Sequence, residues 1–274
     1  PDGEYSNRYE IDGFDKPLVL NCKITVRGEE IFVDWAGTSP QIDRGLNSCL
    51  NYSIAYTEYP IKCALTPNTP KNEGSNRPIH VTAPEGSLLN PRFPAPVSSR
   101  QLVSHFLSAV IYGALAPAIP DKIIADSGAG PTLRTVFSGV GYNNRRFTGI
   151  LFASGGMGAT PVRDGLACTA FPTNAGAGSL EALESVAPLL FWKQEMLQDS
   201  GGAGKYRGGM GQEIVIEVVA QQPLRLAIHS DRRYHPALGL FGGLPGSTTN
   251  VILNDQEPLP AKGRTVVQPH DRIT

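Results

Sequence analysis

The chain has 274 residues, which is enough for one large or two modest domains with a sizeable core. Its 24 basic and 25 acidic residues give a net charge of −1, so there is no basic excess to attract nucleic acid and no acidic tail. No apolar run approaches the roughly 20 residues that span a bilayer. The four cysteines form no CxxC pair, which argues against a zinc knuckle and favours a reducing, cytoplasmic setting.

The beginning of the chain predicts a hairpin followed by a helix. Apolar and polar residues alternate over 18–26 and again over 31–35, with a turn between them, which indicates a β-hairpin. Cys22 falls on the apolar side of this pattern, where a small buried residue fits. Asn47 is placed to cap a helix that runs through Tyr56 towards Pro60.

A proline-rich stretch and the clearest helix come next. Residues 66–96 show few periodic apolar positions, which is typical of a functional segment or one covered by a partner. A long amphipathic helix then begins at a cap, Ser98 or Ser99, and ends before Pro117. His105 falls nearly opposite the apolar stripe of this helix, which favours a solvated histidine over one in a site.

The rest of the chain predicts strands joined by glycine loops. We expect strands at 132–138, 146–153, 187–197, 212–220, 223–230, 249–254 and 264–268. Gln221–Gln222 would join two of them as antiparallel neighbours. The predicted fold class is α+β: a mixed part over 1–125 with one long amphipathic helix, then a β-rich antiparallel sheet or sandwich over 126–274. Both ends look cut, so we expect a piece of a longer polypeptide.

The densest glycine segment runs from Asp199 to Gly211, where six of thirteen residues are glycine. Glycine weakens regular structure, so this density indicates sharp turns or close backbone approach. The loop also carries Lys205 and Arg207, which suits a polar site on a rigid strand. A tight corner where strands cross is equally compatible. Standard nucleotide loops do not fit, because Asp199 and Tyr206 break the Walker spacing and Arg207 breaks the dinucleotide spacing.

Two further patterns could carry chemistry. A second glycine cluster spans 155–158 and is followed by Arg163, Asp164 and Gly165; its backbone N–H groups could bind an anion or simply form a bend. Glu181 and Glu184 would share one helix face, where paired carboxylates can divide acid and base roles or only cap a short helix. No GxSxG or HExxH motif is present, and the five histidines are dispersed.

Taken together and in order, these stretches resemble the hydantoinase B family. The resemblance rests on Asp34–Gln41 with Asn47, Asn72–Gly74 before Arg77–Ile79, Pro84–Pro91 before Pro94–Val97, Gly155–Ala159, Asp164–Gly165, Glu181, Glu184, Asp199–Gly202, Arg207–Gly209, Gly239–Gly243 and Pro245–Gly246. It covers nearly the whole chain and implies that the chain is the C-terminal half of a longer subunit.

The family includes N-methylhydantoinase, 5-oxoprolinase, caprolactamase, and acetone and acetophenone carboxylases, which pair a B part with an ATP-binding hydantoinase A part. The resemblance thus implies part of the B subunit of an ATP-dependent cyclic-amide hydrolase that opens hydantoin, lactam or 5-oxoproline rings. A ketone carboxylase of the acetone or acetophenone type and a structural assembly domain without catalytic residues remain alternatives.

The resemblance also implies a hetero-oligomer with a small-molecule substrate and neither nucleic acid nor membrane as partner. ATP and Mg would be bound by the A-type subunit. A divalent metal would be held by the N-terminal half of the same subunit, so no metal ligand is assigned in this chain, which we expect to be inactive alone.

A phosphorylated lactam or enol needs N–H donors and cations around its phosphate, and carboxylates to direct water. The resemblance implies that substrate or phosphate is bound by Gly155, Gly156, Arg163, Gly201, Gly202, Lys205 and Arg207, and that catalysis uses Asp164, Glu181, Glu184 and Asp199. The same loops could instead pack against the other half and only shape its site.

Overall fold

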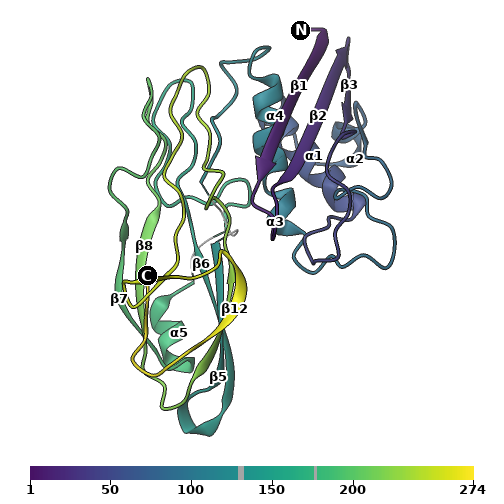
Figure 1. Ribbon diagram of the computed structural model, residues 1–274. Helices are drawn as coiled ribbons and strands as arrows, with labels where there is room; N and C mark the ends of the chain where they lie inside the picture. The colour runs from purple at the N-terminus through teal and green to yellow at the C-terminus, as the bar shows by residue number, and fades with distance from the viewer. Residues whose placement is uncertain (129–132, 176–177) are drawn as a thin grey trace. The chain divides into compact units, whose positions relative to one another are not determined.

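The computed structural model describes residues 1–128, 133–175 and 178–274. The chain forms two compact units (Figure 1). The first comprises Pro1–Asp126 and Ala159–Arg163, and the second comprises Ser127–Gly158 and Asp164–Thr274. Helices pack on a sheet in the first unit and antiparallel sheets dominate the second, so the expected α+β class is confirmed.

The first unit is built on a four-stranded sheet with the order β1-β2-β3-β4. Its strands are β1 (Gly3–Ile11), β2 (Leu18–Arg27), β3 (Glu30–Asp34) and β4 (Ile79–Thr82). The expected hairpin is confirmed as β2 and β3, and Cys22 is buried there, where desolvation raises the pKa of its thiol. Strand β1 was not expected, because most of its residues are polar and the apolar alternation is weak.

Helices α1 (Leu50–Leu65) and α4 (Leu107–Leu115) pack on this sheet, beside the shorter α2 (Glu73–Asn76) and α3 (Gln101–Ser104) (Figure 1). The expected cap at Asn47 is wrong. Its amide instead bonds to backbone groups of Ile42, Arg44 and Pro96, so it fixes a loop, and α1 begins after Cys49. Pro60 lies inside α1 rather than at its end.

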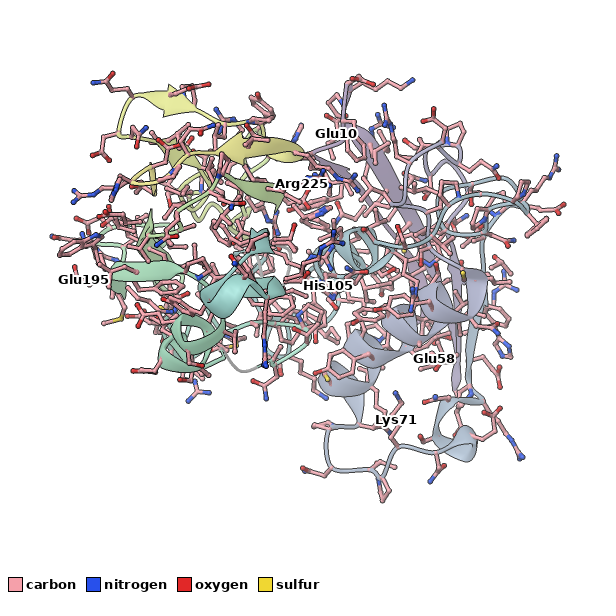
Figure 2. All side chains as sticks on the ribbon, turned by 90° about the horizontal axis from the view of Figure 1, so that it is seen from below. Glu10, Glu58, Lys71, His105, Glu195 and Arg225 are labelled. Carbon is pink, nitrogen blue, oxygen red and sulfur yellow. The ribbon has the colours of Figure 1, made fainter. Side chains whose placement is uncertain are left out.

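The expected long helix is divided into α3 and α4, and this division explains the position of His105. The residue lies in the turn between the two helices, so the helical stripe does not apply to it. Its side chain is 7% exposed, its ring centroid lies 5.4 Å from that of Tyr56, and Nδ1 has no hydrogen-bond partner within the described residues (Figure 2). The expectation of a solvated histidine is therefore wrong. Burial lowers the pKa of His105 to about 4.

The low pKa of His105 predicts a loss of stability in acid. The unfolded chain binds this proton near pH 6.5 and the folded chain only near pH 4, so stability falls as the pH drops through that window. The loss should be on the order of 3 kcal/mol. Urea unfolding at pH 7 and pH 4 should show that His105→Gln removes this part of the acid loss.

The acid loss should persist in His270→Gln, because that side chain is 82% exposed. An unchanged pH dependence in His105→Gln would contradict the neutral, buried state of this residue.

The second unit is a sandwich of two antiparallel sheets with the orders β11-β10-β13-β8-β7 and β12-β9-β5-β6. The strands are β5 (Leu133–Val140), β6 (Arg146–Ala153), β7 (Leu189–Met196), β8 (Gln212–Val218), β9 (Leu224–His229), β10 (Ile252–Leu253), β11 (Glu257–Pro258), β12 (Lys262–Val267) and β13 (Arg272–Ile273). Side chains from both sheets, such as Phe137 and Leu226 from one and Ile216 and Val218 from the other, share one core. Helix α5 (Leu180–Val186) contacts β6 and β7.

The link at Gln221–Gln222 does not form the expected hairpin. Strand β8 pairs with β7 and β13, whereas β9 pairs with β5 and β12, so the link carries the chain from one sheet to the other. Both strands alternate as expected, but alternation shows only that one face is buried and not which strand lies alongside. The strand expected at 249–254 is reduced to the two residues of β10.

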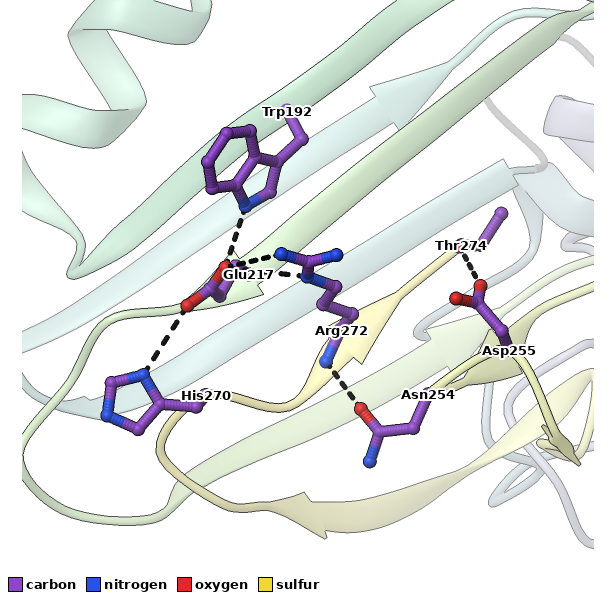
Figure 3. A network of polar contacts seen from close by, with 7 residues as sticks. All are labelled: Trp192, Glu217, Asn254, Asp255, His270, Arg272 and Thr274. Atoms are coloured by element: carbon purple, nitrogen blue, oxygen red, sulfur yellow. Dashed lines mark hydrogen bonds and ion pairs between the residues drawn. The ribbon is translucent and has the colours of Figure 1, made fainter.

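A polar network attaches the last strand to its sheet (Figure 3). The Glu217 carboxylate accepts a hydrogen bond from Trp192 Nε1 at 2.7 Å and contacts His270 and Arg272 at 3.4 and 3.5 Å. The hydrogen bonds from Trp192 and His270, followed by Arg272, lower the pKa of this carboxyl. The Asn254 side chain accepts from the backbone N–H of Arg272 at 2.8 Å. One acidic residue thus joins β7, β8 and β13.

Candidate functional site

The two glycine-rich segments lie together in the second unit as neighbouring loops joined by backbone hydrogen bonds. Met157 donates to the Leu166 carbonyl at 2.9 Å, and Gly209 donates to the Met157 carbonyl at 2.9 Å. Gly208 donates to the Gly202 carbonyl at 3.0 Å. The segment 207–211 therefore lies between the loop at 155–158 and the loop at 199–202. We call these segments, with 164–168, the glycine stack.

Close backbone approach explains why glycine occupies these positions. A Cβ atom on Gly156 would lie 1.8 Å from the Gly209 carbonyl oxygen, and one on Gly201 would lie 2.0 Å from the Gly208 oxygen. A Cβ atom on Gly165 would lie 1.9 Å from the Met157 oxygen. No side chain fits at such distances. The interpretation of the glycine-rich segment as a tight corner is therefore supported, and the interpretation as a binding site must rest on observations other than the number of glycines.

Ser200 holds the ends of the 199–211 loop and was not identified from the sequence. Its hydroxyl donates to the Leu197 carbonyl at 2.6 Å and accepts from the Gly211 N–H at 2.8 Å, and the residue is 8% exposed. Across the stack, the Gln212 side chain accepts from the Ser154 N–H at 3.1 Å. The sequence signal that could have identified Ser200 is its position directly after Asp199, near the end of a strand. Short hydroxyl side chains at such positions commonly form hydrogen bonds with nearby backbone groups.

The structure brings two of the candidate carboxylates, Asp164 and Asp199, into contact with a third candidate, Arg207. Asp164 Oδ1 accepts from the backbone N–H of Arg207 at 2.8 Å, and the N–H of Gly165 donates to the Arg207 carbonyl at 2.8 Å. The Arg207 guanidinium lies 3.6 Å from Asp199 Oδ1. Asp199 has a left-handed backbone with φ 56°. These contacts fix the backbone of Arg207 from both sides and leave its side chain exposed.

The Arg207 side chain keeps most of its hydrogen-bonding capacity. It is 57% exposed and makes one ion pair, so several of its five N–H donors face solvent. An exposed pair of this kind contributes little to stability. Lys205 is also exposed, with Nζ 5.3 Å from the centroid of the Tyr206 ring. Two cations are therefore available on one loop, beside the carboxylates of Asp164 and Asp199.

Backbone donors are also available in the stack. Within the described residues, the N–H groups of 201–206 donate no hydrogen bond, nor do those of Gly155 and Gly156, although both of these glycines are buried. Buried N–H groups are nearly always paired, with protein, water or a ligand. Consecutive unpaired N–H groups suit an anion. The four glycines expected to bind phosphate thus carry N–H donors that have no acceptor among residues 1–128, 133–175 and 178–274.

Two of the expected carboxylates lie elsewhere. Glu181 and Glu184 are on α5, before β7, whereas Asp199 follows β7 at its other end, about 25 Å away along the strand. Glu181 accepts from Ser179 at 2.6 Å, which lowers the pKa of the Glu181 carboxyl, and Glu184 accepts from the Phe191 N–H at 2.8 Å. The structure therefore does not bring this pair to the glycine stack.

Arg163 belongs to the first unit, at the end of the segment Ala159–Arg163. It lies in a turn in which the Thr160 hydroxyl accepts from the Arg163 N–H at 3.0 Å. Over residues 1–128, 133–175 and 178–274, no group of three His, Cys, Asp or Glu side chains is placed to hold a metal ion. No helix among these residues has the length and apolar character needed to cross a bilayer.

The close approach in the glycine stack predicts a large effect of a single methyl group. Gly156→Ala should destabilise the chain by about 3 kcal/mol or more, because its Cβ would meet backbone that cannot move aside. Gly178→Ala is the matched control, since among the described residues, its chain neighbours aside, no atom lies within 4 Å of its Cβ, and its φ is not positive. Urea unfolding of both variants checks this. Equal stability of the two variants would show that the loops are not packed as described.

Comparison with known proteins gives a consistent result. A protein of uncharacterised function from Methanocaldococcus jannaschii is 31% identical over 253 residues, which is 91% of this chain and 44% of that protein. The caprolactamase subunit beta of Pseudomonas jessenii is 29% identical over 263 residues, 92% of this chain and 44% of that subunit. The chain therefore spans less than half the length of these relatives.

The crystal structure of the ATP-dependent caprolactamase from Pseudomonas jessenii has the same fold. It superimposes with a TM-score of 0.86 at 24% identity, over 100% of this chain and 50% of that one. The sequence profile described as Hydantoinase B/oxoprolinase matches residues 1–274. This chain belongs to the hydantoinase B/oxoprolinase family.

Proposed function

We propose that the chain is part of the B subunit of an ATP-dependent cyclic-amide hydrolase, which opens a hydantoin, lactam or 5-oxoproline ring together with an ATP-binding A subunit. The observation that carries this proposal is the family match over residues 1–274. A relative and a solved structure with the same fold are caprolactamases, and the solved enzyme is ATP-dependent. ATP and Mg are assigned to the A subunit in this proposal, and the setting is the cytoplasm.

The glycine stack would contribute the part of the site that receives a phosphorylated intermediate. The unpaired N–H groups of Gly155, Gly156, Gly201 and Gly202 would face the phosphate oxygens. Such donors act without reorganising during the reaction, because the loops that carry them are already packed. Arg207 and Lys205 would add positive charge where negative charge develops.

The two nearby carboxylates would have different tasks. Asp164 is already engaged with the Arg207 backbone at 2.8 Å, so its main task is to position that residue. Asp199 is 74% exposed and keeps one oxygen free of any contact within the described residues, so it could accept a proton from an attacking water. Glu181 and Glu184 are left out of the proposed site, because their contacts belong to α5 and β7.

The proposal predicts that activity depends on a complete assembly. The chain, within its full subunit and combined with a hydantoinase A-type subunit, should consume ATP only when a hydantoin, a lactam or 5-oxoproline is added. A coupled ATP hydrolysis assay measures this. Absence of ATP consumption with every cyclic amide would remove the proposal, and labelled bicarbonate incorporated into an acid product would decide for a ketone carboxylase instead.

Removal of the Arg207 side chain should lower activity without dissociating the complex. Arg207→Ala should reduce kcat/KM by about 100-fold, as found when one preorganised charge-stabilising donor is lost. Assembly measured by native mass spectrometry should be unchanged, because within residues 1–128, 133–175 and 178–274 the side chain makes a single, exposed ion pair. Arg27→Ala, at an exposed position in the first unit, is the control and should retain full activity.

Asp199→Ala distinguishes a chemical role from a structural one. A complex that assembles normally and turns over at the wild-type rate with both Asp199→Ala and Arg207→Ala would show that the loop only completes the assembly. The chain would then be an assembly domain rather than part of a catalytic centre.

A further inference from the structure

The four-stranded sheet β12-β9-β5-β6 has an outer face that carries only positive charge. Side chains alternate along each strand, and Phe137, Leu151, Leu226 and Val267 point to the core. The intervening residues occupy the opposite face. We call this the basic face; by register it comprises Arg134, Val136, Ser138, Val140, Arg146, Thr148, Ile150, Phe152, Arg225, Ala227, His229, Lys262, Arg264 and Val266.

No aspartate or glutamate belongs to the basic face. Lys262 is neutralised by Asp231, which follows β9, in a buried pair at 2.5 Å. The four arginines, Arg134, Arg146, Arg225 and Arg264, have no such neighbour: within the described residues their side chains form no ion pair and no hydrogen bond. The buried Nε of Arg134 likewise lacks a partner there. The excess is local, because the chain as a whole has a net charge of −1.

The excess charge acts on the one histidine of this face. The pKa of His229 is lowered to about 4, first by burial and then by Arg134, Arg264 and Lys262. Arg225 and Arg264 lie on adjacent strands at diagonal positions, since Arg225 pairs with Val266 and Arg264 pairs with Ala227. Diagonal neighbours lie about 7 Å apart, so these guanidinium groups repel each other. An anionic surface placed over the face would relieve this repulsion.

Exposed apolar side chains lie among the arginines. Ile150 is 48% exposed, Phe152 is 38% exposed and Val266 is 54% exposed. Arginine together with aromatic and aliphatic residues is typical of the contact regions of protein interfaces, where lysine is depleted. A nucleic-acid surface would instead be expected on a strongly basic domain. The combination therefore favours a protein partner.

We propose that the basic face docks a carboxylate-rich surface of the partner subunit, with Arg225 and Arg264 contacting its Asp and Glu side chains and Ile150, Phe152 and Val266 contacting its apolar residues. The inference rests on the proposed function, because that function supplies the partner. Beyond that function, the inference names the surface of this chain that makes the contact and the chemistry of the partner's surface that it meets. Such charge complementarity mainly sets partner choice and association rate.

Charge reversal tests the proposal in the full subunit. The dissociation constant for a purified hydantoinase A-type subunit is measured by biolayer interferometry for wild type and for the double variant Arg225→Glu, Arg264→Glu. The double variant should bind about tenfold or more weakly. Wild-type affinity should fall with added salt. Arg92→Glu, which changes an exposed arginine of the first unit, is the control and should bind like wild type.

A second pair of variants keeps the charge and identifies the opposite residues. Arg225→Lys and Arg264→Lys place amines at the same positions, so a carbodiimide should couple them to carboxylates of the A-type subunit, and mass spectrometry should identify the linked Asp or Glu. Circular dichroism of the double variant Arg225→Glu, Arg264→Glu checks directly whether its weaker binding reflects misfolding.

The outcomes separate this inference from the proposed function. If the folded double variant binds the A-type subunit with wild-type affinity and the lysine variants give no cross-links, the docking proposal is overturned. The proposed hydrolase function is not affected by that result. Binding to a mixed-sequence single-stranded DNA is measured as well. If the wild type binds this DNA and the double variant does not, while assembly is unchanged, the face is a nucleic-acid surface and the docking proposal is overturned. Failure of the wild-type subunits to associate removes the proposed function itself.

Discussion

Contact between main chains, without side chains between them, is the constraint on which the second unit depends. Where a Cβ on Gly156 would lie 1.8 Å from the Gly209 carbonyl oxygen, only glycine allows the loops to touch. The loops join the ends of β6, β7 and β8, so the same contacts that hold them together also fix the strands of both sheets relative to one another. A loop region made rigid in this way can present polar groups in a defined arrangement.

This rigidity connects the architecture with the proposed chemistry. The hydrogen bonds of Asp164 and Gly165 to the Arg207 peptide leave the guanidinium at the surface of a fixed backbone. The N–H groups of the stack that find no acceptor in the described part of the chain are held in the same way. An anion bound there would meet donors whose positions are already determined, which is the condition under which electrostatic stabilisation is most effective.

Much of this arrangement was accessible from the sequence, and the failures have definite causes. Strict alternation identified the hairpin, β6 and β8 closely, and the glycine density marked the loops that do come together. Alternation could not show that Gln221–Gln222 connects different sheets, because pairing partners leave no local signal. His105 was misplaced because a helical stripe was continued through a turn. Glu181 and Glu184 lie on α5, which precedes β7, whereas Asp199 follows β7.

The first unit contains Ala159–Arg163, a segment that both follows and precedes residues of the second unit. The polypeptide therefore passes between the units three times: after Asp126, after Gly158 and after Arg163. A single proteolytic cut after Asp126 would separate Ala159–Arg163 from the rest of the first unit, a cut after Arg163 would separate Ser127–Gly158 from the rest of the second, and a cut after Gly158 would divide both units. During synthesis, moreover, the first unit stays incomplete until the segment Ser127–Gly158 of the second has emerged from the ribosome.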